Sequence, residues 1–274
     1  MQTSRNPARA FLVSYGFLLV ALALECLAFE LLSRRQGIRP FLSVDTLLLV
    51  LNQSAIYGVA SVGMTFVIIS GGIDLSVGSI IAFGGVVCAL ATKNLGGGWD
   101  AMAVGWCAAI AAGLCTGSFS SLFISRFQIP PFIATLAVMS SVRGLGFLIV
   151  KGKPVFDLPE RYTFLGRHMI GDAVPIGILI LAVVFIAGAV LLNTTRFGRH
   201  VRAIGGSEES ARLSGVPVDR VKWAVYCMSG ALAVLAGLML SSKMKSGDPT
   251  VGVGDELQVI AAVVVGGTSL TGGR

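Results

Sequence analysis

The sequence predicts an all-α fold, a polytopic membrane helix bundle formed by residues 1–274 as a single domain with about seven or eight membrane segments. The composition supports this, because 54% of the 274 residues are hydrophobic and only 13% are charged. A soluble domain carries roughly 25% charged residues. Apolar runs recur along the chain, and most of the basic residues behind the net charge of +7 lie between them. Basic residues that flank apolar runs are typical of membrane proteins.

The same composition argues against several other classes of protein. Binding to nucleic acid is not expected, since no basic stripe is interleaved with exposed aromatic residues. Five cysteines lie in apolar runs without a Cys-x-x-Cys pair, so packing is their expected role. His168 and His200 fall in separate connections. We therefore expect no metal site and no catalytic residue, and an intramembrane enzyme has little support.

The first expected span runs from Phe11 to Leu32 and follows two basic residues, Arg5 and Arg9. A segment of this length can cross the hydrocarbon core, so we interpret it as an uncleaved membrane helix.

The second expected span, Leu47 to Ile69, is apolar except for a polar group that includes Asn52, Gln53 and Tyr57. Gln53 and Tyr57 are four residues apart and share a helix face. Polar contact between helices is the favoured interpretation, and lining of a pore is the alternative.

The stretch from Gly71 to Ser79, GGIDLSVGS, places an acid between two apolar runs. The two glycines permit a turn, and we expect Asp74 and Ser76 to accept hydrogen bonds from N–H groups that open the next helix. The following run, Val77 to Ala91, falls short of the roughly 20 residues that cross a bilayer. A broken or re-entrant element near residues 71–79 is one interpretation, and a capped loop at the membrane surface is the other.

Further spans are expected at about 101–125 and 132–150, and the second of these is the most polar of all. It carries Thr135, Ser140, Ser141 and Arg143. An arginine inside a membrane segment is costly. We expect Arg143 to be paired in the interior, with extension toward the end of its helix as the alternative.

A polar connection, 151–175, has few signs of a core of its own and leads to a span at about 174–192. The loop 193–222 is the most basic part of the chain, which predicts that it and the N-terminus are cytoplasmic. Within it, Ser207 suits a helix N-cap, Glu208 and Glu209 a first turn, and Gly215 a C-terminal cap. So short a helix is best explained by docking onto another molecule, although an ordinary connector remains the alternative.

The last expected span is Trp223 to Leu240, and a later apolar run, Leu257 to Val265, is too short to cross. That run precedes GGTSLTGG, a pattern similar to the stretch at Gly71. A second half-helix is one interpretation, and a chance repetition of glycines is the other.

Several motifs in one order are similar to a known family. They are GGIDLSVGSIIAFGGV, IPPFIATLAVMSSVRGLGFLI, RFGRHVRAIGGSEESARLSGVPVDRVK and IAAVVVGGTSLTGG. The chain resembles the membrane permease subunit of ribose-type ABC sugar importers over nearly its whole length. The resemblance implies a bacterial inner membrane location and three kinds of partner: cytoplasmic ATP-binding subunits, a periplasmic sugar-binding protein, and a second permease subunit in a homodimer or heterodimer.

The resemblance also implies site residues. The segment from Gly205 to Gly215 matches the family's ATPase-docking loop, with Ser207 in place of the usual Asn and Ser210 in place of Ala. This assigns ATPase coupling to Gly205, Ser207, Glu208, Glu209, Ala211 and Gly215. No Walker-type motif occurs in the sequence, so we expect no cofactor in this chain and ATP with Mg in the partner ATPase.

The expected function is therefore that of a permease for a monosaccharide such as ribose, xylose or galactose. The residues expected along the translocation path are Asn52, Gln53, Asp74, Ser76, Thr135, Ser140 and Arg143. A proton-coupled secondary transporter using Asp74 and Arg143 is one alternative, and a permease of the same family for a non-sugar polar solute is another. Because the family has about ten membrane segments, the resemblance implies that residues 1–274 are incomplete at the C-terminus.

Overall fold

A computed structural model describes residues 7–171 and 173–273 of the chain. Their contacts divide into two compact units, Met1–Leu51 and Asn52–Arg274. Among the described residues, seven helices are long and apolar enough to cross a membrane. The predicted fold class, an all-α polytopic membrane bundle, is confirmed.

The first unit consists of α1 (Pro7–Arg35), a turn, and the beginning of α2 (Val44–Ile69). The carboxylate of Glu30 organises the turn: Oε2 accepts a hydrogen bond from the backbone N–H of Leu42 at 2.9 Å, and Oε1 accepts one from Nε of Arg34 at 2.6 Å. One acid thus holds the end of α1 and the chain that follows it.

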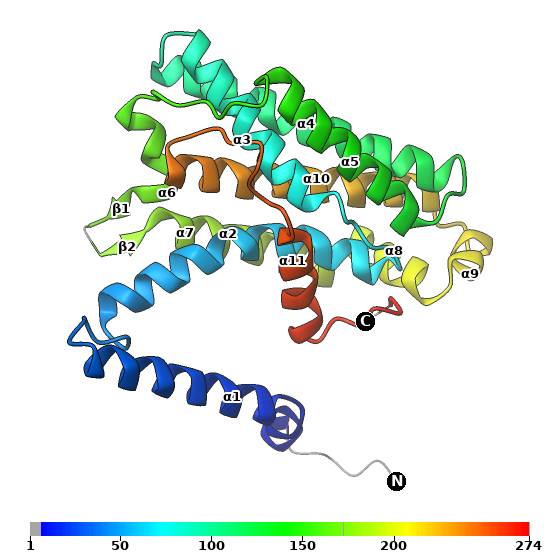
Figure 1. The fold of residues 1–274 in the computed structure, drawn as a ribbon. Coiled ribbons are helices and arrows are strands. Elements are labelled where there is room, and N and C mark those ends of the chain that lie inside the picture. The colour runs from blue at the N-terminus through cyan, green and yellow to red at the C-terminus, as the bar shows by residue number, and fades with distance from the viewer. Residues whose placement is uncertain (1–6, 172, 274) are drawn as a thin grey trace. The chain divides into compact units, whose positions relative to one another are not determined.

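The second unit contains the rest of α2 and all later elements (Figure 1). The long helices are α3 (Val77–Asn94), α4 (Trp99–Ser125), α5 (Pro131–Ile149), α7 (Ile176–Thr194) and α10 (Val218–Met244). The shorter elements are η1 (Glu160–Thr163), α6 (Phe164–Arg167), β1 (Met169–Ile170), β2 (Val174–Pro175), α8 (Arg196–Gly206), α9 (Glu208–Leu213) and α11 (Asp255–Val265). At 11 residues, α11 is about 16 Å long at 1.5 Å per residue, too short to cross a hydrocarbon core of about 30 Å.

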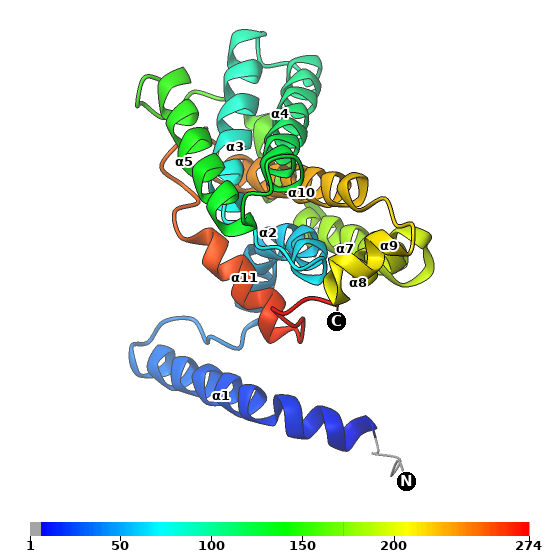
Figure 2. The same cartoon turned by 90° about the vertical axis from the view of Figure 1, so that its right-hand side faces the viewer.

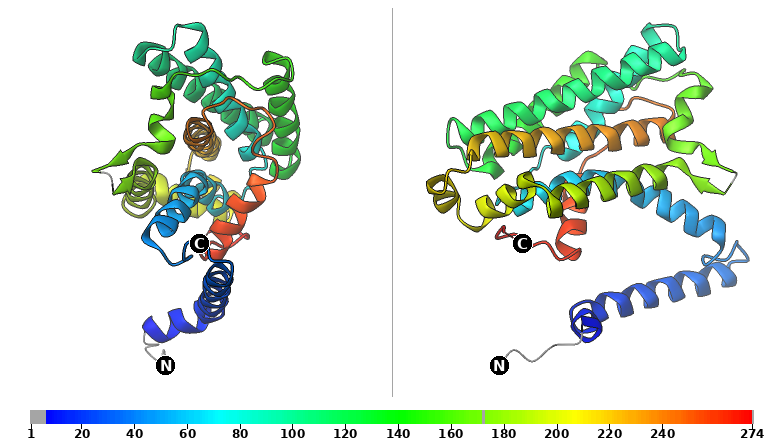
Figure 3. Two further views of the ribbon diagram at one scale, coloured as in Figure 1. Left: turned by 60° about the vertical axis from the view of Figure 1, so that its left-hand side comes forward. Right: turned by 180° about the vertical axis from the view of Figure 1, so that it is seen from behind.

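Helix α10 lies at the centre of this unit, with α3, α4 and α5 on one side and α7 and the later part of α2 on the other (Figures 2 and 3). Glycines let the helix backbones touch where α10 meets α4. A Cβ atom on Gly113 would lie 2.5 Å from the carbonyl oxygen of Gly230, and one on Gly230 would lie 2.2 Å from that of Gly113. Small residues that permit such close approach are typical of helix interfaces in membranes.

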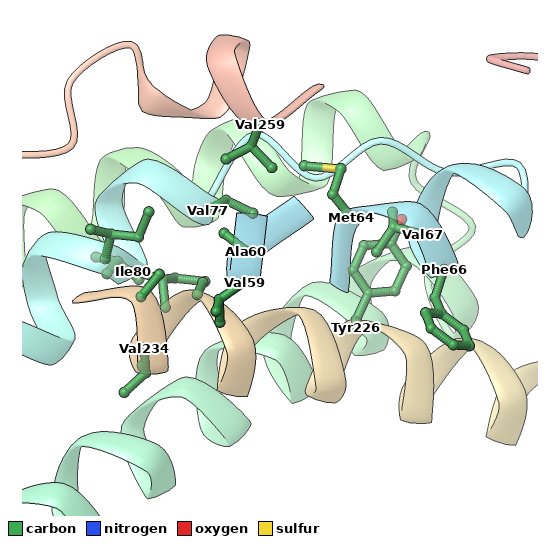
Figure 4. Close-up of a cluster of buried hydrophobic side chains, with 14 of the residues drawn as sticks. Val59, Ala60, Met64, Phe66, Val67, Val77, Ile80, Tyr226, Val234 and Val259 are labelled. Carbon is green, nitrogen blue, oxygen red and sulfur yellow. The ribbon is translucent and has the colours of Figure 1, made fainter. Parts of the chain in front are cut away.

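The core of the unit is apolar and lies where α2, α3 and α10 meet (Figure 4). Val59, Phe66, Ile80, Tyr226 and Val234 are all buried there. In contrast, α7 exposes large apolar side chains to the outside, namely Leu179, Val183, Phe185, Ile186 and Val190. A bundle that is apolar both inside and on its outer helices fits an environment of lipid.

The connection 151–175 folds onto α10 and forms no core of its own. Within it, η1 and α6 precede an antiparallel pair of two-residue strands. The phenol of Tyr162 and the hydroxyl of Ser241 lie 2.7 Å apart, and the backbone N–H of Gly166 donates to the hydroxyl of Ser242 at 2.8 Å. The expectation of a segment without a core of its own is consistent with this docking onto a helix.

Candidate functional site

The chain breaks between α2 and α3 at the predicted position. Helix α2 ends at Ile69 and α3 begins at Val77, and Gly71 has a φ of +81° in the turn between them. A residue without Cβ suits this left-handed backbone. Asp74 and Ser76 are 1% and 0% exposed, so the break lies in the interior of the second unit.

The carboxylate of Asp74 receives three hydrogen bonds. Oδ1 accepts from the backbone N–H and the hydroxyl of Ser76, and Oδ2 accepts from the hydroxyl of Ser229 in α10 at 2.9 Å. A buried acid without such donors would carry a large desolvation cost. The three donors therefore explain how an acid is accommodated between two membrane helices.

The prediction that Asp74 and Ser76 accept hydrogen bonds from N–H groups at the start of α3 is confirmed for Asp74, which accepts from the backbone N–H of Ser76, and is wrong for Ser76. Ser76 is the N-cap residue by position, yet its hydroxyl makes no capping hydrogen bond. The hydroxyl instead donates a hydrogen bond to Asp74. A hydrogen bond to a buried carboxylate stabilises the fold more than one to a neutral N–H group does.

Thr135 attaches α5 to the same break. Its side chain is buried, and Oγ1 accepts a hydrogen bond from the backbone N–H of Leu75 at 3.2 Å. The hydroxyl also lies 3.3 Å from the carbonyl oxygen of Ile73. The structure thus brings Asp74, Ser76 and Thr135 together as one polar cluster, which we call the Asp74 cluster.

Arg143 binds a different segment. Its Nη1 donates to the carbonyl of Pro249 at 3.0 Å and its Nη2 to that of Gly252 at 3.1 Å, and Nη1 also contacts the carbonyl of Val251. The preference for interior pairing is confirmed, and the partners are backbone carbonyls of the loop that precedes α11.

Asn52 and Gln53 form a third group and Ser140 stands alone. The amide of Asn52 donates to the carbonyl of Gly166 at 3.3 Å, and Oε1 of Gln53 accepts from Nζ of Lys243. Ser140 is exposed and donates only to Leu136 of its own helix at 3.2 Å. The residues predicted along the translocation path are therefore not brought into one cavity, and their role stays a prediction.

The basic loop contains a helix that sequence reasoning missed. Helix α8 places Val201 and Ile204 in the interior, and Phe197 packs beside Phe66 with ring centroids 6.1 Å apart. Phe197, Val201 and Ile204 follow the spacing i, i+4, i+7, which is typical of an amphipathic helix. That spacing was the available signal, although the many arginines and glycines around it made it weak.

The predicted short helix is confirmed as α9. The hydroxyl of Ser207 accepts a hydrogen bond from the backbone N–H of Ser210 at 3.2 Å, and the two acids Glu208 and Glu209 occupy the first turn. At the other end, Gly215 has a φ of +83°, as a glycine C-cap requires. Ala211 is buried and fixes α9 against the protein.

Ion pairs hold α9 in place and leave one acid exposed. Glu208 binds Nζ of Lys222 at 2.6 Å and Nη2 of Arg212 at 3.4 Å, and Arg212 binds Oδ1 of Asp219 at 3.0 Å. The hydrogen bond and charge of Asp219, followed by those of Glu208, raise the pKa of Arg212 above its usual value. Glu209 is exposed and forms no ion pair within the described residues.

Gly205 connects this loop to the end of α2. A Cβ atom on Gly205 would lie 1.8 Å from the carbonyl oxygen of Ile69, the last residue of α2. That carbonyl accepts a hydrogen bond from the backbone N–H of Gly273 at 2.9 Å. Backbone atoms of the loop 193–222 and of the chain after α11 therefore meet at the end of α2. The residues next to these positions in the sequence do not indicate this contact.

Metal binding has no support from the described residues, where no group of three His, Cys, Asp or Glu side chains could hold an ion. The site consists of buried hydrogen bonds and exposed charge.

Comparison with known proteins agrees with this description. Residues 46–273 match the family model described as "Branched-chain amino acid transport system / permease component". The chain is 39% identical to the ribose import permease protein RbsC of Escherichia coli strain K12, with 85% of this chain and 73% of that protein covered. No solved structure matches the chain.

Two further relatives point the same way. Identity is 44% with RbsC of Bacillus subtilis strain 168, covering 85% of this chain and 72% of that protein. Identity is 41% with the L-arabinose ABC transporter permease protein AraH of Azospirillum brasilense, covering 79% of this chain and 62% of that protein. This chain therefore belongs to the family of the branched-chain amino acid transport system permease component, and it is a multi-pass transport subunit of the ABC permease type, not an enzyme.

Proposed function

We propose that this chain is the permease subunit of an ATP-driven importer for a monosaccharide. The names of its relatives support a sugar as cargo, since those proteins are permeases for ribose and L-arabinose. Helix α9 supports coupling to a second subunit: it is capped, braced by ion pairs, and directs the unpaired carboxylate of Glu209 outward.

In this proposal the partner ATPase binds ATP and Mg, and its movement is transmitted through α9. The contact between Gly205 and Ile69 offers the route, because it joins the loop carrying α9 to the end of α2. From there the chain enters the break, and the Asp74 cluster connects the break to α5 and α10. A displacement of α9 would therefore reach three membrane helices through direct contacts.

The translocation path is proposed to use Asn52, Gln53, Asp74, Ser76, Thr135, Ser140 and Arg143, together with a second permease subunit. Sugars are bound through hydroxyl groups, and side chains that donate and accept hydrogen bonds suit such a path. The residues 1–274 would form one transmembrane permease domain in the bacterial inner membrane, with the N-terminus and the loop 193–222 cytoplasmic. A periplasmic sugar-binding protein would deliver the cargo.

The single observation that carries the proposal is Glu209, which is exposed, lies in the first turn of a braced helix and forms no ion pair with any residue that the structure describes. Glu209→Lys reverses the charge at a helix N-terminus that already has partial positive charge, so it should weaken binding of the partner ATPase. Asp100→Lys is the matched control, because Asp100 is also an exposed acid in the first turn of a helix, at the beginning of α4, whereas α9 lies beside the end of α4.

The measurement is copurification of the ATPase with each variant from membranes. We expect the ATPase to be lost with Glu209→Lys and retained with Asp100→Lys. Equal recovery of the ATPase with both variants would contradict the assignment of α9. Uptake that stops when the ATPase is deleted, and persists with a protonophore, would separate this mechanism from proton-coupled transport.

A further inference from the structure

A cleft of about 440 Å³ lies beside the end of α4 and the beginning of α10. Its wall combines a basic residue, an indole and several hydroxyl groups, including Arg126, Trp223, Ser118, Ser121 and Ser125. Trp223 is 52% exposed, and its Nε1 donates to the hydroxyl of Ser118 at 3.1 Å. Tryptophan with a hydrogen-bonded ring nitrogen is typical of the boundary between lipid and water.

Two further clefts adjoin the first one and differ from it in polarity. A polar cleft of about 580 Å³ beside α9 shares Ser125, Arg126 and Asp219 with it. An apolar groove of about 570 Å³ between α4 and α5 shares Cys115 and Phe119 with it. The lining of the three adjoining clefts therefore changes from charged beside α9, through mixed, to apolar between the membrane segments α4 and α5.

The groups at the polar end lack partners of their own. Within the described residues the guanidinium of Arg126 forms no ion pair, and the hydroxyl oxygen of Ser125 is buried without a hydrogen-bond partner. A buried polar atom without a partner carries a cost that a bound group can remove.

The charge at this end favours a zwitterion. Of the charged residues that line the polar cleft, Glu208 and Asp219 are paired with Lys222 and Arg212, whereas Arg126 and Glu209 form no ion pair within the described residues. A purely anionic headgroup would bind Arg126 but leave Glu209 without a counter-charge. A headgroup with a phosphate and an ammonium would satisfy both signs, because a guanidinium binds phosphate well and a carboxylate binds ammonium.

We propose that these three clefts hold one phospholipid with an ethanolamine headgroup. In the chain without the ATPase, its phosphate binds Arg126 and the hydroxyl of Ser125, its ammonium faces Glu209, and an acyl chain lies along Cys115 and Phe119 in the groove between α4 and α5. The occupant is a lipid because the site runs along helices long and apolar enough to cross a bilayer, and its zones match an amphipathic molecule.

The test is native mass spectrometry of the full chain without the ATPase. The protein is released from bilayers that contain equal amounts of phosphatidylethanolamine, phosphatidylglycerol and phosphatidylcholine. The wild type should retain one phosphatidylethanolamine in preference to the other two. Arg126→Gln should retain it about tenfold less, the effect of losing one charge-assisted hydrogen bond. Arg220→Gln is the matched control. Arg220 is an exposed base in the first turn of α10, next to Asp219, and it lines none of the three clefts.

A second measurement locates the lipid independently of that variant. Phosphatidylethanolamine with a photoreactive group in its acyl chain should label residues 112–126, which form the end of α4 and its C-cap. Preference for phosphatidylglycerol, equal retention in Arg126→Gln and Arg220→Gln, or a crosslink from 112–126 to a second copy of the chain would each overturn the proposal.

Discussion

The hydroxyl of Ser229 donates a hydrogen bond to Oδ2 of Asp74 over 2.9 Å, joining positions 155 residues apart. Both side chains are buried, at 0% and 1% exposure. This contact fastens the middle of α10 to the break between α2 and α3. Since α10 also packs against α3 and α4, the stability of the break depends on the central helix of the unit.

Ser229→Ala should therefore destabilise the protein by about 1–3 kcal/mol, because one oxygen of a buried carboxylate loses its donor. Thermal unfolding of the purified protein in detergent measures the effect. Ser140→Ala is the control: its hydroxyl is exposed and bonds only within its own helix, so its removal should change stability by less than about 0.5 kcal/mol. Equal effects of the two variants would contradict the role assigned to Ser229.

Substitutions of Asp74 itself should give a graded result. Asp74→Asn retains one oxygen acceptor for Ser76 and removes the charge, so we expect a small loss of transport. Asp74→Leu leaves the donors on Ser76 and Ser229 without an acceptor, and a large loss should follow. Uptake of radiolabelled sugar by vesicles is the measurement. Complete loss in both variants would show that the charge is required, as a proton-coupled mechanism demands.

Arg143 should restrict the motion of the loop that precedes α11. Its guanidinium reaches three carbonyls, of Pro249, Val251 and Gly252. A lysine presents a single ammonium in place of a planar fork and is a poor substitute at such a site. Arg143→Lys should speed amide hydrogen exchange in residues 250–254, while exchange in α9 stays unchanged. Unchanged exchange in 250–254 would mean that these contacts do not hold the loop.

Much of the fold was predictable because membrane helices depend on local composition. The long apolar runs, the break at Gly71 to Ser79 and the caps of α9 are each encoded within a few consecutive residues, and each was located from the sequence. The interior pairing of Arg143 followed from the cost of a charge in lipid. The partners of Arg143 could not be predicted, because every residue has a backbone carbonyl and the sequence does not distinguish one from another.

The missed features are long-range contacts. Ser229 lies among other small residues of α10, and nothing near it in the chain indicates that it faces Asp74. The role of the Ser76 hydroxyl has a different cause, since Asp74 is only two residues away. A serine before a helix usually caps it, and only the burial of the neighbouring acid reverses this preference. The burial of Asp74 and its contact with Ser229 are both set by packing, which local sequence does not specify.

Gly205 and Gly206 provide a sharper test of the contact between the coupling loop and α2. Both end the same helix, and alanine is favoured over glycine in a helix by about 1 kcal/mol. A Cβ atom on Gly206 meets nothing within 4 Å, so Gly206→Ala should be neutral or slightly stabilising. A Cβ atom on Gly205 would lie 1.8 Å from the carbonyl oxygen of Ile69, a clash that only a shift of backbone can relieve.

Gly205→Ala should therefore separate α8 from the end of α2 and cost about 1–3 kcal/mol, as forced overpacking does. If this contact transmits movement from α9 to the break, the variant should still bind the partner ATPase, since Glu209 and the cap at Ser207 are untouched. ATP hydrolysis would then continue while sugar uptake falls. The measurement is the ratio of sugar transported to ATP hydrolysed in reconstituted vesicles, compared with Gly206→Ala. A ratio that stays the same in both variants would show that the movement takes another route.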